Sequence, residues 1–251
     1  MLESRLMAYL DVGGFPEVQS LDRSMRIRVL QSYLDVVILR DIVERHRVAG
    51  VVALRHMIRH LIGHPACMFT VNRFHGDLRS RQIPVGKDTL HEYLDHLCDA
   101  YLFFPVYIHT HSERVRQVNP RKMYAIDTGL VRACSLSPEA DTGHLLENLV
   151  FLELRRRGRS MEYYRTDSGK EVDFLVTDPD EGVTLVQVCS DPTSRGTRER
   201  EIGALAEAMS ELGHESATLV TLVDSESVDV DAGTIRIVPA SRWALGLDGE
   251  Q

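Results

Sequence analysis

The stretches EVDFLV (171–176) and VTLVQVC (183–189) decide the fold of the second half of the chain. Both are rich in β-branched and apolar residues, and a polar turn separates them, which predicts two neighbouring β-strands. Asp173 and Gln187 interrupt these apolar runs. Positions 187 and 189 are two apart, so Gln187 and Cys189 are expected on one face of their strand. The polar interruptions predict a candidate site on the sheet.

Further elements extend this pair of strands in both directions along the chain. Apolar periodicity predicts a helix over 144–157, which Gly158 ends, and a strand over 161–165. A polar helix over 197–212 and strands over 217–223 and 234–239 follow. The connections between these elements are short. The order predicts an α/β domain over residues 140–251.

The first half of the chain has a different pattern. Residues 1–139 are expected to form a helical region, with one long helix over 24–47 and a second over 51–62. From about residue 66 to 127 the expected order is helix, turn, helix, strand, polar loop, strand. That order is typical of a winged helix.

Composition narrows the class of protein. The 251 residues are 43% hydrophobic and 26% charged, which is ordinary for globular proteins. No stretch is long and apolar enough for a membrane span, and residues 1–14 lack the apolar core of a secretory signal. The four cysteines are scattered and include no CxxC pair. We therefore expect a cytoplasmic protein with free thiols and no membrane partner.

The net charge of −8 is unevenly distributed. Residues 1–139 contain 18 Lys and Arg against 15 Asp and Glu, whereas residues 140–251 contain 11 against 22. The mean field of the acidic second part repels phosphate. Any contact with nucleic acid is therefore expected in the first part.

The candidate site has the residue types of metal-dependent phosphodiester cleavage. That chemistry needs clustered oxygen ligands for Mg²⁺, together with a cation near the phosphate. Glu147 on the helix over 144–157 and Asp173 would be the ligands, and a Glu-x-Lys pair on the next strand would complete the set.

Several motifs resemble the C-terminal region of prokaryotic AAA-type ATPases that carry a domain of unknown function. These motifs are GGFPEV (13–18), SYLDVVILRDIVERH (32–46), LLENLVFLELRRRG (145–158), YYRTDSGKEVDFLV (163–176), LVQVCSD (185–191) and TREREIGAL (197–205). The resemblance covers nearly the whole chain. It implies an ATPase module followed by a winged helix and a restriction-endonuclease-like, PD-(D/E)xK domain.

The ATPase module itself is missing from the sequence. In the pattern GxxxxGK[ST] around Gly86-Lys87, Arg81 stands in place of the first glycine and Asp88 in place of Ser or Thr. The expectation is a fragment of a longer ATPase or a shortened relative, and in either case a non-ATPase accessory region.

The site departs from the pattern that the resemblance implies for an active nuclease. Gln187 replaces a ligand carboxylate and Cys189 replaces the lysine. The favoured interpretation is a degenerate domain, in which Glu147 and Asp173 are held by hydrogen bonds and no enzyme activity remains. The alternative is a Mg²⁺-dependent nuclease acting on DNA, with Glu147 and Asp173 as metal ligands. Lys170, Arg198 or Arg200 would then supply the cation.

The predicted winged helix offers a second candidate site. Its expected recognition helix exposes Asp88, Glu92 and Asp95, which do not suit a phosphate backbone. Basic residues lie around that helix: Arg73, Arg79, Arg81, Arg114, Arg116, Arg121 and Lys122. We expect them to contact DNA backbone. The alternatives are docking of a partner protein and a structural oligomerisation module.

Three histidines, His56, His60 and His64, recur every four residues. The form HMIRH lacks the glutamate of the zinc motif HExxH, and Gly63 is expected to end the helix before His64. We interpret them as a solvated face and not as a metal site.

Overall fold

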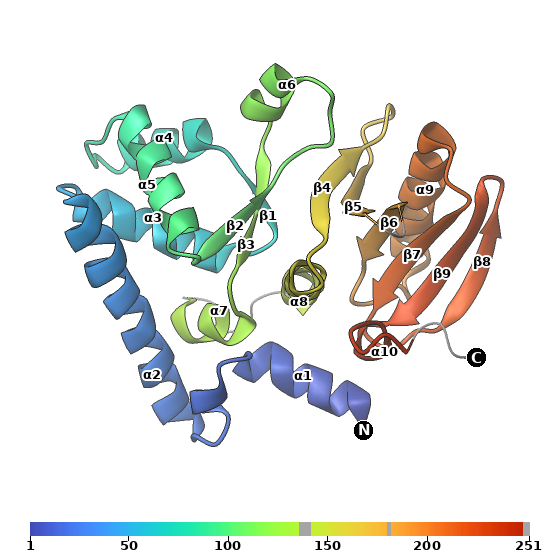
Figure 1. The fold of residues 1–251 in the computed structure, drawn as a ribbon, viewed down its shortest axis with the longest axis horizontal. Helices are drawn as coiled ribbons and strands as arrows, with labels where there is room; N and C mark the ends of the chain where they lie inside the picture. The colour runs from blue at the N-terminus through green and yellow to red at the C-terminus, as the bar shows by residue number, and fades with distance from the viewer. Residues whose placement is uncertain (136–141, 180–181, 248–251) are drawn as a thin grey trace. The chain divides into compact units, whose positions relative to one another are not determined.

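The computed structural model describes residues 1–135, 142–179 and 182–247 (Figure 1). The chain divides into two compact units. The first, which we call the helical unit, consists of Ala8–Pro105 and Pro120–His144; the second, the α/β unit, consists of Met1–Met7, Val106–Asn119 and Leu145–Gln251. The boundary predicted between residues 139 and 140 lies outside the described residues.

The helical unit is built mainly from α-helices. These are α2 (Arg23–Val36), α3 (Val51–Gly63), α4 (Val71–Ser80), α5 (Lys87–Asp99) and α7 (Thr128–Cys134). The 3-10 turn η1 (Pro16–Val18) precedes them, and so does α1 (Leu2–Val12), which belongs to this unit from Ala8 onward. The Asp22 carboxylate begins α2 by accepting the backbone N–H groups of Ser24 and Met25, at 2.8 and 3.0 Å. Residues 128–134 are helical, where we had expected a connection.

The long helix predicted over 24–47 changes type along its length. After Val36 it continues as the π-helix η2, Val37–Glu44. Ile38 and Ile42 are its buried residues. Because they are four residues apart, they lie near one another on α- and π-helices alike, so apolar spacing does not distinguish the two.

A three-stranded sheet completes the helical unit. Its order is β1-β3-β2, with β1 at Cys67–Phe69, β2 at Phe103–Val106 and β3 at Arg121–Ala125. Together with α3, α4 and α5 this gives the order helix, strand, helix, helix, strand, loop, strand. The predicted order over residues 66–127 is therefore observed, and the short strand β1 is added in front of it.

The GGFPEV motif joins distant parts of this unit. Asp127 Oδ2 accepts the Gly14 N–H at 2.6 Å, and Asp127 Oδ1 accepts the Leu130 N–H at 2.8 Å. A Cβ on Gly129 would lie 2.1 Å from the Val12 carbonyl oxygen, so only glycine allows this approach. The motif has a packing role at this point.

The α/β unit is a mixed sheet with helices, as predicted. The strand order is β4-β5-β6-β7-β9-β8. Pairing is antiparallel from β4 to β6 and between β8 and β9, and parallel from β6 through β7 to β9. The bounds are α8 (Thr142–Arg156), β4 (Ser160–Arg165), β5 (Glu171–Asp178), β6 (Gly182–Val188), α9 (Arg195–Leu212), β7 (Ser216–Thr221), β8 (Glu226–Val230), β9 (Gly233–Pro239) and α10 (Ala240–Trp243).

Helix α9 packs on this sheet and closes its core (Figure 1). Leu205 and Met209 of α9 are buried together with Leu185, Leu219 and Ile235 of the strands. Strand β8 was missed by the sequence analysis because its residues, ESVDV, are partly acidic and largely exposed. This composition is common in edge strands, where charge discourages pairing with other chains.

The polar loop predicted over 109–122 is more ordered than expected. It contains the short helix α6 (Glu113–Val118). Before α6, Ile108 pairs in parallel with Tyr163 of β4. The His109 N–H donates to the Tyr163 carbonyl at 2.7 Å, and the Tyr163 N–H donates to the Tyr107 carbonyl at 2.9 Å. The segment therefore extends the edge of β4 within the α/β unit.

Candidate functional site

Asp173 and Gln187 meet on the sheet, as the strand pattern predicted. They lie on the neighbouring strands β5 and β6 and are 6% and 5% exposed. The Asp173 N–H donates to Gln187 Oε1 at 2.9 Å, and the Val188 N–H donates to Asp173 Oδ2 at 2.9 Å. Each side chain therefore accepts a hydrogen bond from the backbone of the neighbouring strand.

A further member of this cluster, Glu201, was missed by the sequence analysis. Gln187 Nε2 donates to Glu201 Oε2 at 2.7 Å. Glu201 is 7% exposed, and its Oε1 accepts from Arg200 at 2.6 and 3.1 Å. The signal was available in the sequence, because Glu201 occupies the buried stripe of α9 with Ala204, Leu205 and Ala208. We had interpreted this helix as polar.

Cys189 and Glu147 are also buried in the α/β unit. Cys189 follows β6 and is 8% exposed. Burial raises the pKa of its thiol, which is therefore neutral near pH 7 and supplies no charge. Glu147 lies on α8 and is 9% exposed.

The donor set does not fit a Mg²⁺ ion. Asp173 Oδ2, Gln187 Oε1 and both Glu201 oxygens already accept hydrogen bonds. Within residues 1–135, 142–179 and 182–247, no three His, Cys, Asp or Glu side chains are grouped so that they could hold a metal. Mg²⁺ prefers several anionic or water oxygens in octahedral geometry. In the nuclease alternative Glu147 and Asp173 are the metal ligands, and one of the two Asp173 oxygens is already bonded to the Val188 N–H.

The three cations considered as replacements for the lysine each pair with a carboxylate. Lys170 Nζ lies 2.8 Å from Glu207, Arg198 lies 2.5 Å from Glu226 and Arg200 lies 2.6 Å from Glu201. Only Arg200 among them contacts the cluster of Asp173, Gln187 and Glu201. Its guanidinium is neutralised there by the Glu201 carboxylate.

The β4–β5 turn fixes α9 in place. The Asp167 N–H donates to Glu211 at 3.0 Å and the Ser168 N–H donates to Glu207 at 3.2 Å. Hydrogen bonds from Lys170 first, and then from Ser168, lower the pKa of Glu207 to about 2. These contacts hold α9 against β5, and so hold Glu201 against Gln187.

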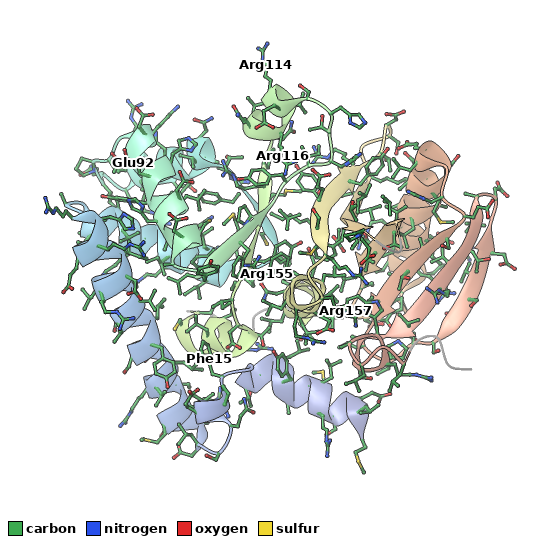
Figure 2. The ribbon with its side chains drawn as sticks, in the orientation of Figure 1. Phe15, Glu92, Arg114, Arg116, Arg155 and Arg157 are labelled. Carbon is green, nitrogen blue, oxygen red and sulfur yellow. The ribbon has the colours of Figure 1, made fainter. Side chains whose placement is uncertain are left out.

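The basic residues predicted to contact nucleic acid differ in their exposure to solvent. Arg73 and Arg79 of α4, and Arg81 directly after it, are exposed. Arg114 is exposed on α6 and points away from it in Figure 2. Arg116 donates to Glu162 at 2.6 Å and lies over the Tyr107 ring at 5.0 Å.

The two residues from β3 are less accessible. Arg121 is half-buried. Lys122 is only 4% exposed, so its prediction as a surface contact for phosphate is corrected. Lys122 lies in β3, where every residue after Arg121 is buried, whereas we had expected it at the end of a polar loop.

The exposed face of α5 is acidic, as expected. Asp88, Glu92 and Asp95 are exposed there beside Lys87 and His91, and Figure 2 labels Glu92 on this helix. Such a face repels a phosphate backbone.

Comparison with known proteins places the chain in a family. A family model described as a domain of unknown function, DUF8612, matches residues 3–140, more than half of the chain. The chain belongs to the DUF8612 family. A second model, also of a domain of unknown function, DUF4143, matches residues 142–243 of this DUF8612 protein.

Two relatives of this DUF8612 protein are uncharacterised proteins. One, from Methanocaldococcus jannaschii, is 31% identical over 250 residues, which are 96% of this chain and 55% of the relative. Another, from Haemophilus influenzae, is 31% identical over 180 residues, which are 72% of this chain and 44% of the relative. The DUF8612 chain thus spans about half the length of each. No solved structure matches it significantly. Among the described residues, no helix combines the length and apolarity that crossing a membrane requires.

Proposed function

We propose that this chain is a non-catalytic, nucleic-acid-binding region of a cytoplasmic AAA-type ATPase family protein. In this proposal the residues from about 66 to 127 form a winged helix that binds nucleic acid backbone. The α/β unit is a degenerate restriction-endonuclease-like domain. The motif resemblance supports the link to AAA-type ATPases, and the greater length of the relatives is consistent with it.

One observation carries the non-catalytic part of the proposal. The Gln187 carboxamide bridges the Asp173 backbone and the Glu201 carboxylate within a buried cluster. Phosphodiester cleavage builds negative charge on phosphoryl oxygens, which a metal and a nearby cation must stabilise. Here the amide replaces a carboxylate, Cys189 is neutral, and Arg200 is paired with Glu201. The amide weakens the binding of a metal, and the other two features leave the place where cleavage needs positive charge without an unpaired cation among these residues.

The exposed arginines support the binding part. Arg73 and Arg79 lie on α4, and Arg81 comes directly after it. All three are exposed. Binding through Arg and Lys contacts to phosphate releases counterions and depends steeply on salt. We assign backbone contact to these three residues and not to the acidic face of α5.

A partner protein is the second candidate for the helical unit. The specific observation in its favour is that acidic face, with Asp88, Glu92 and Asp95 exposed on one helix. A basic partner would complement it.

The proposal is tested by measuring DNA affinity as a function of salt. A fluorescein-labelled 20-base-pair duplex is titrated with the chain, with the triple variant Arg73→Ala, Arg79→Ala, Arg81→Ala, and with a control variant, Arg23→Ala, Arg28→Ala, Arg45→Ala. The control removes the same charge from exposed positions in and after α2 and η2. The first variant should lower the log–log salt slope by about 2.7, because each lost phosphate contact accounts for about 0.9. Equal slopes for both variants would contradict the assignment. Absence of binding to duplex and to single-stranded DNA alike would favour the partner protein.

A further inference from the structure

A cavity of about 220 Å³ opens in the helical unit between the end of α3, β1 and α4. No residue of the candidate nuclease-like cluster lines it. The residues that matter in its lining are His60 and His64 from the end of α3, Phe69 from β1, and Phe74, Arg73 and Asp77 from α4.

One wall of the cavity is aromatic. The ring centroid of His60 lies 5.2 Å from that of Phe74, 5.8 Å from that of Phe69 and 4.7 Å from that of His64. Phe69 and Phe74 are buried, so they hold the His60 ring in place from behind. Burial, and then the neighbouring His64, lower the pKa of His60. His60 therefore presents a neutral ring near pH 7, and His64 continues this surface toward solvent.

The mouth of the cavity is polar. Arg73 and Asp77 are one helical turn apart on α4, and both are exposed. Both line the cavity, so one cation and one carboxylate lie near the aromatic wall. A ligand for this cavity should therefore combine a planar ring, an anion close to the ring and a hydrogen-bond donor for a carboxylate.

We propose that the cavity takes one unpaired nucleotide of a single-stranded nucleic acid. The base stacks on His60 and His64, Arg73 contacts its phosphate, and Asp77 accepts a hydrogen bond from an exocyclic amino group. Aromatic residues bind single strands in this way because the faces of unpaired bases are accessible, whereas duplex bases are stacked on one another. This inference rests on the proposed function and specifies the kind of nucleic acid.

The test separates bases from phosphates. Three fluorescein-labelled single strands of 12 nucleotides are titrated with the full chain. They are oligo-dA, oligo-dT and an abasic strand with the same number of phosphates. We expect oligo-dA to bind most tightly, because adenine has an exocyclic amino group and thymine has none. His60→Ala should weaken oligo-dA binding about tenfold and leave the abasic strand unchanged.

Further variants test each role in the cavity. His60→Phe should retain most of the affinity because it keeps a ring, which also separates stacking from misfolding. Asp77→Ala should abolish the preference for oligo-dA over oligo-dT. His91→Ala, on the exposed face of α5, is the matched control and should change affinity less than about twofold. Free AMP should compete only at far higher concentration than the strand, since it lacks the flanking phosphates.

The outcomes distinguish this inference from the proposed function. Equal binding of the duplex, the abasic strand and oligo-dA, unaffected by His60→Ala, would overturn the inference and leave backbone binding intact. Competition by AMP at the same concentration as the strand would also overturn the single-strand assignment. Absence of binding to all the nucleic acids would overturn both.

Discussion

At the scale of single residues, Gln187 is the centre of the buried cluster in the α/β unit. Its amide group satisfies the Asp173 N–H and one oxygen of Glu201. Gln187→Ala would leave a buried donor and a buried carboxylate without these partners. The expected loss in the free energy of unfolding is about 2–4 kcal/mol.

Urea denaturation of the variant measures this loss. Gln117→Ala is a suitable control, because Gln117 donates only to Glu113 on the exposed helix α6. The control should stay within about 0.5 kcal/mol of the unmodified chain. If both variants unfold at the same urea concentration as the unmodified chain, the cluster has no structural role.

The sequence predicted this cluster only in part. The two consecutive strand patterns placed Asp173 and Gln187 on neighbouring strands, and the period of two placed Gln187 and Cys189 on one face. Glu201 was not predicted, since which buried polar groups pair depends on how α9 packs on the sheet. A charged residue within the Ala-Leu-Ala stripe of α9 was the only local signal.

The cysteines give a second prediction for single residues. Burial is the main cause that raises the pKa of Cys98 to about 12 and of Cys134 to about 11, and it raises that of Cys189. Only the thiolate reacts, so at pH 8 Cys98 and Cys134 should react with iodoacetamide at least about a hundredfold more slowly in the folded chain than in urea. Cys189 should also react more slowly in the folded chain. Mass spectrometry of the labelled peptides measures the rates.

The direction of the associated pH dependence follows from the same shifts. A pKa that is raised on folding favours the neutral thiol in the folded state. This contribution to stability is fully present below the pKa of the unfolded thiol, about 8.5, and is lost as the pH rises toward 11–12. Rapid alkylation of folded Cys98 at pH 8 would show that this thiol is not buried.

At the scale of elements, the segment of residues 106–119 belongs with the α/β unit. Glu162 of β4 accepts from His109 Nδ1 at 2.7 Å and from Arg116 at 2.6 Å. Glu162→Ala should therefore loosen the pairing between this segment and β4. Amide hydrogen exchange at Tyr163 and His109 should speed up about tenfold, whereas Glu113→Ala on α6 should not change it.

Unchanged exchange in the Glu162 variant would mean that backbone pairing alone holds the segment. The sequence did not predict this arrangement. Its turn residues and charges indicated a polar loop, and the pairing of Ile108 with Tyr163 joins residues far apart in the sequence. By contrast, α3, α4 and α5 were predicted close to their observed bounds, since each has a regular apolar stripe and a local end signal.

At the scale of the whole molecule, the charge of each part of the chain agrees with the function that we propose for it. The acidic part from residue 140 onward contains the cluster around Gln187, and its mean field opposes the approach of a phosphate backbone. The exposed arginines proposed to contact nucleic acid lie in the first part. The binding region and the non-catalytic region that we propose are thus separate along the sequence.

The most direct test of this account is a cleavage assay. Linear and supercoiled DNA are incubated with the chain in Mg²⁺ or Mn²⁺, beside a Glu147→Ala, Asp173→Ala variant whose urea midpoint has been measured. We predict no cleavage above the level of that variant, because the described residues of the cluster offer neither a fitting metal ligand set nor a cation that is not paired with a carboxylate. Metal-dependent cleavage by the unmodified chain that disappears in the variant would contradict it and establish a nuclease.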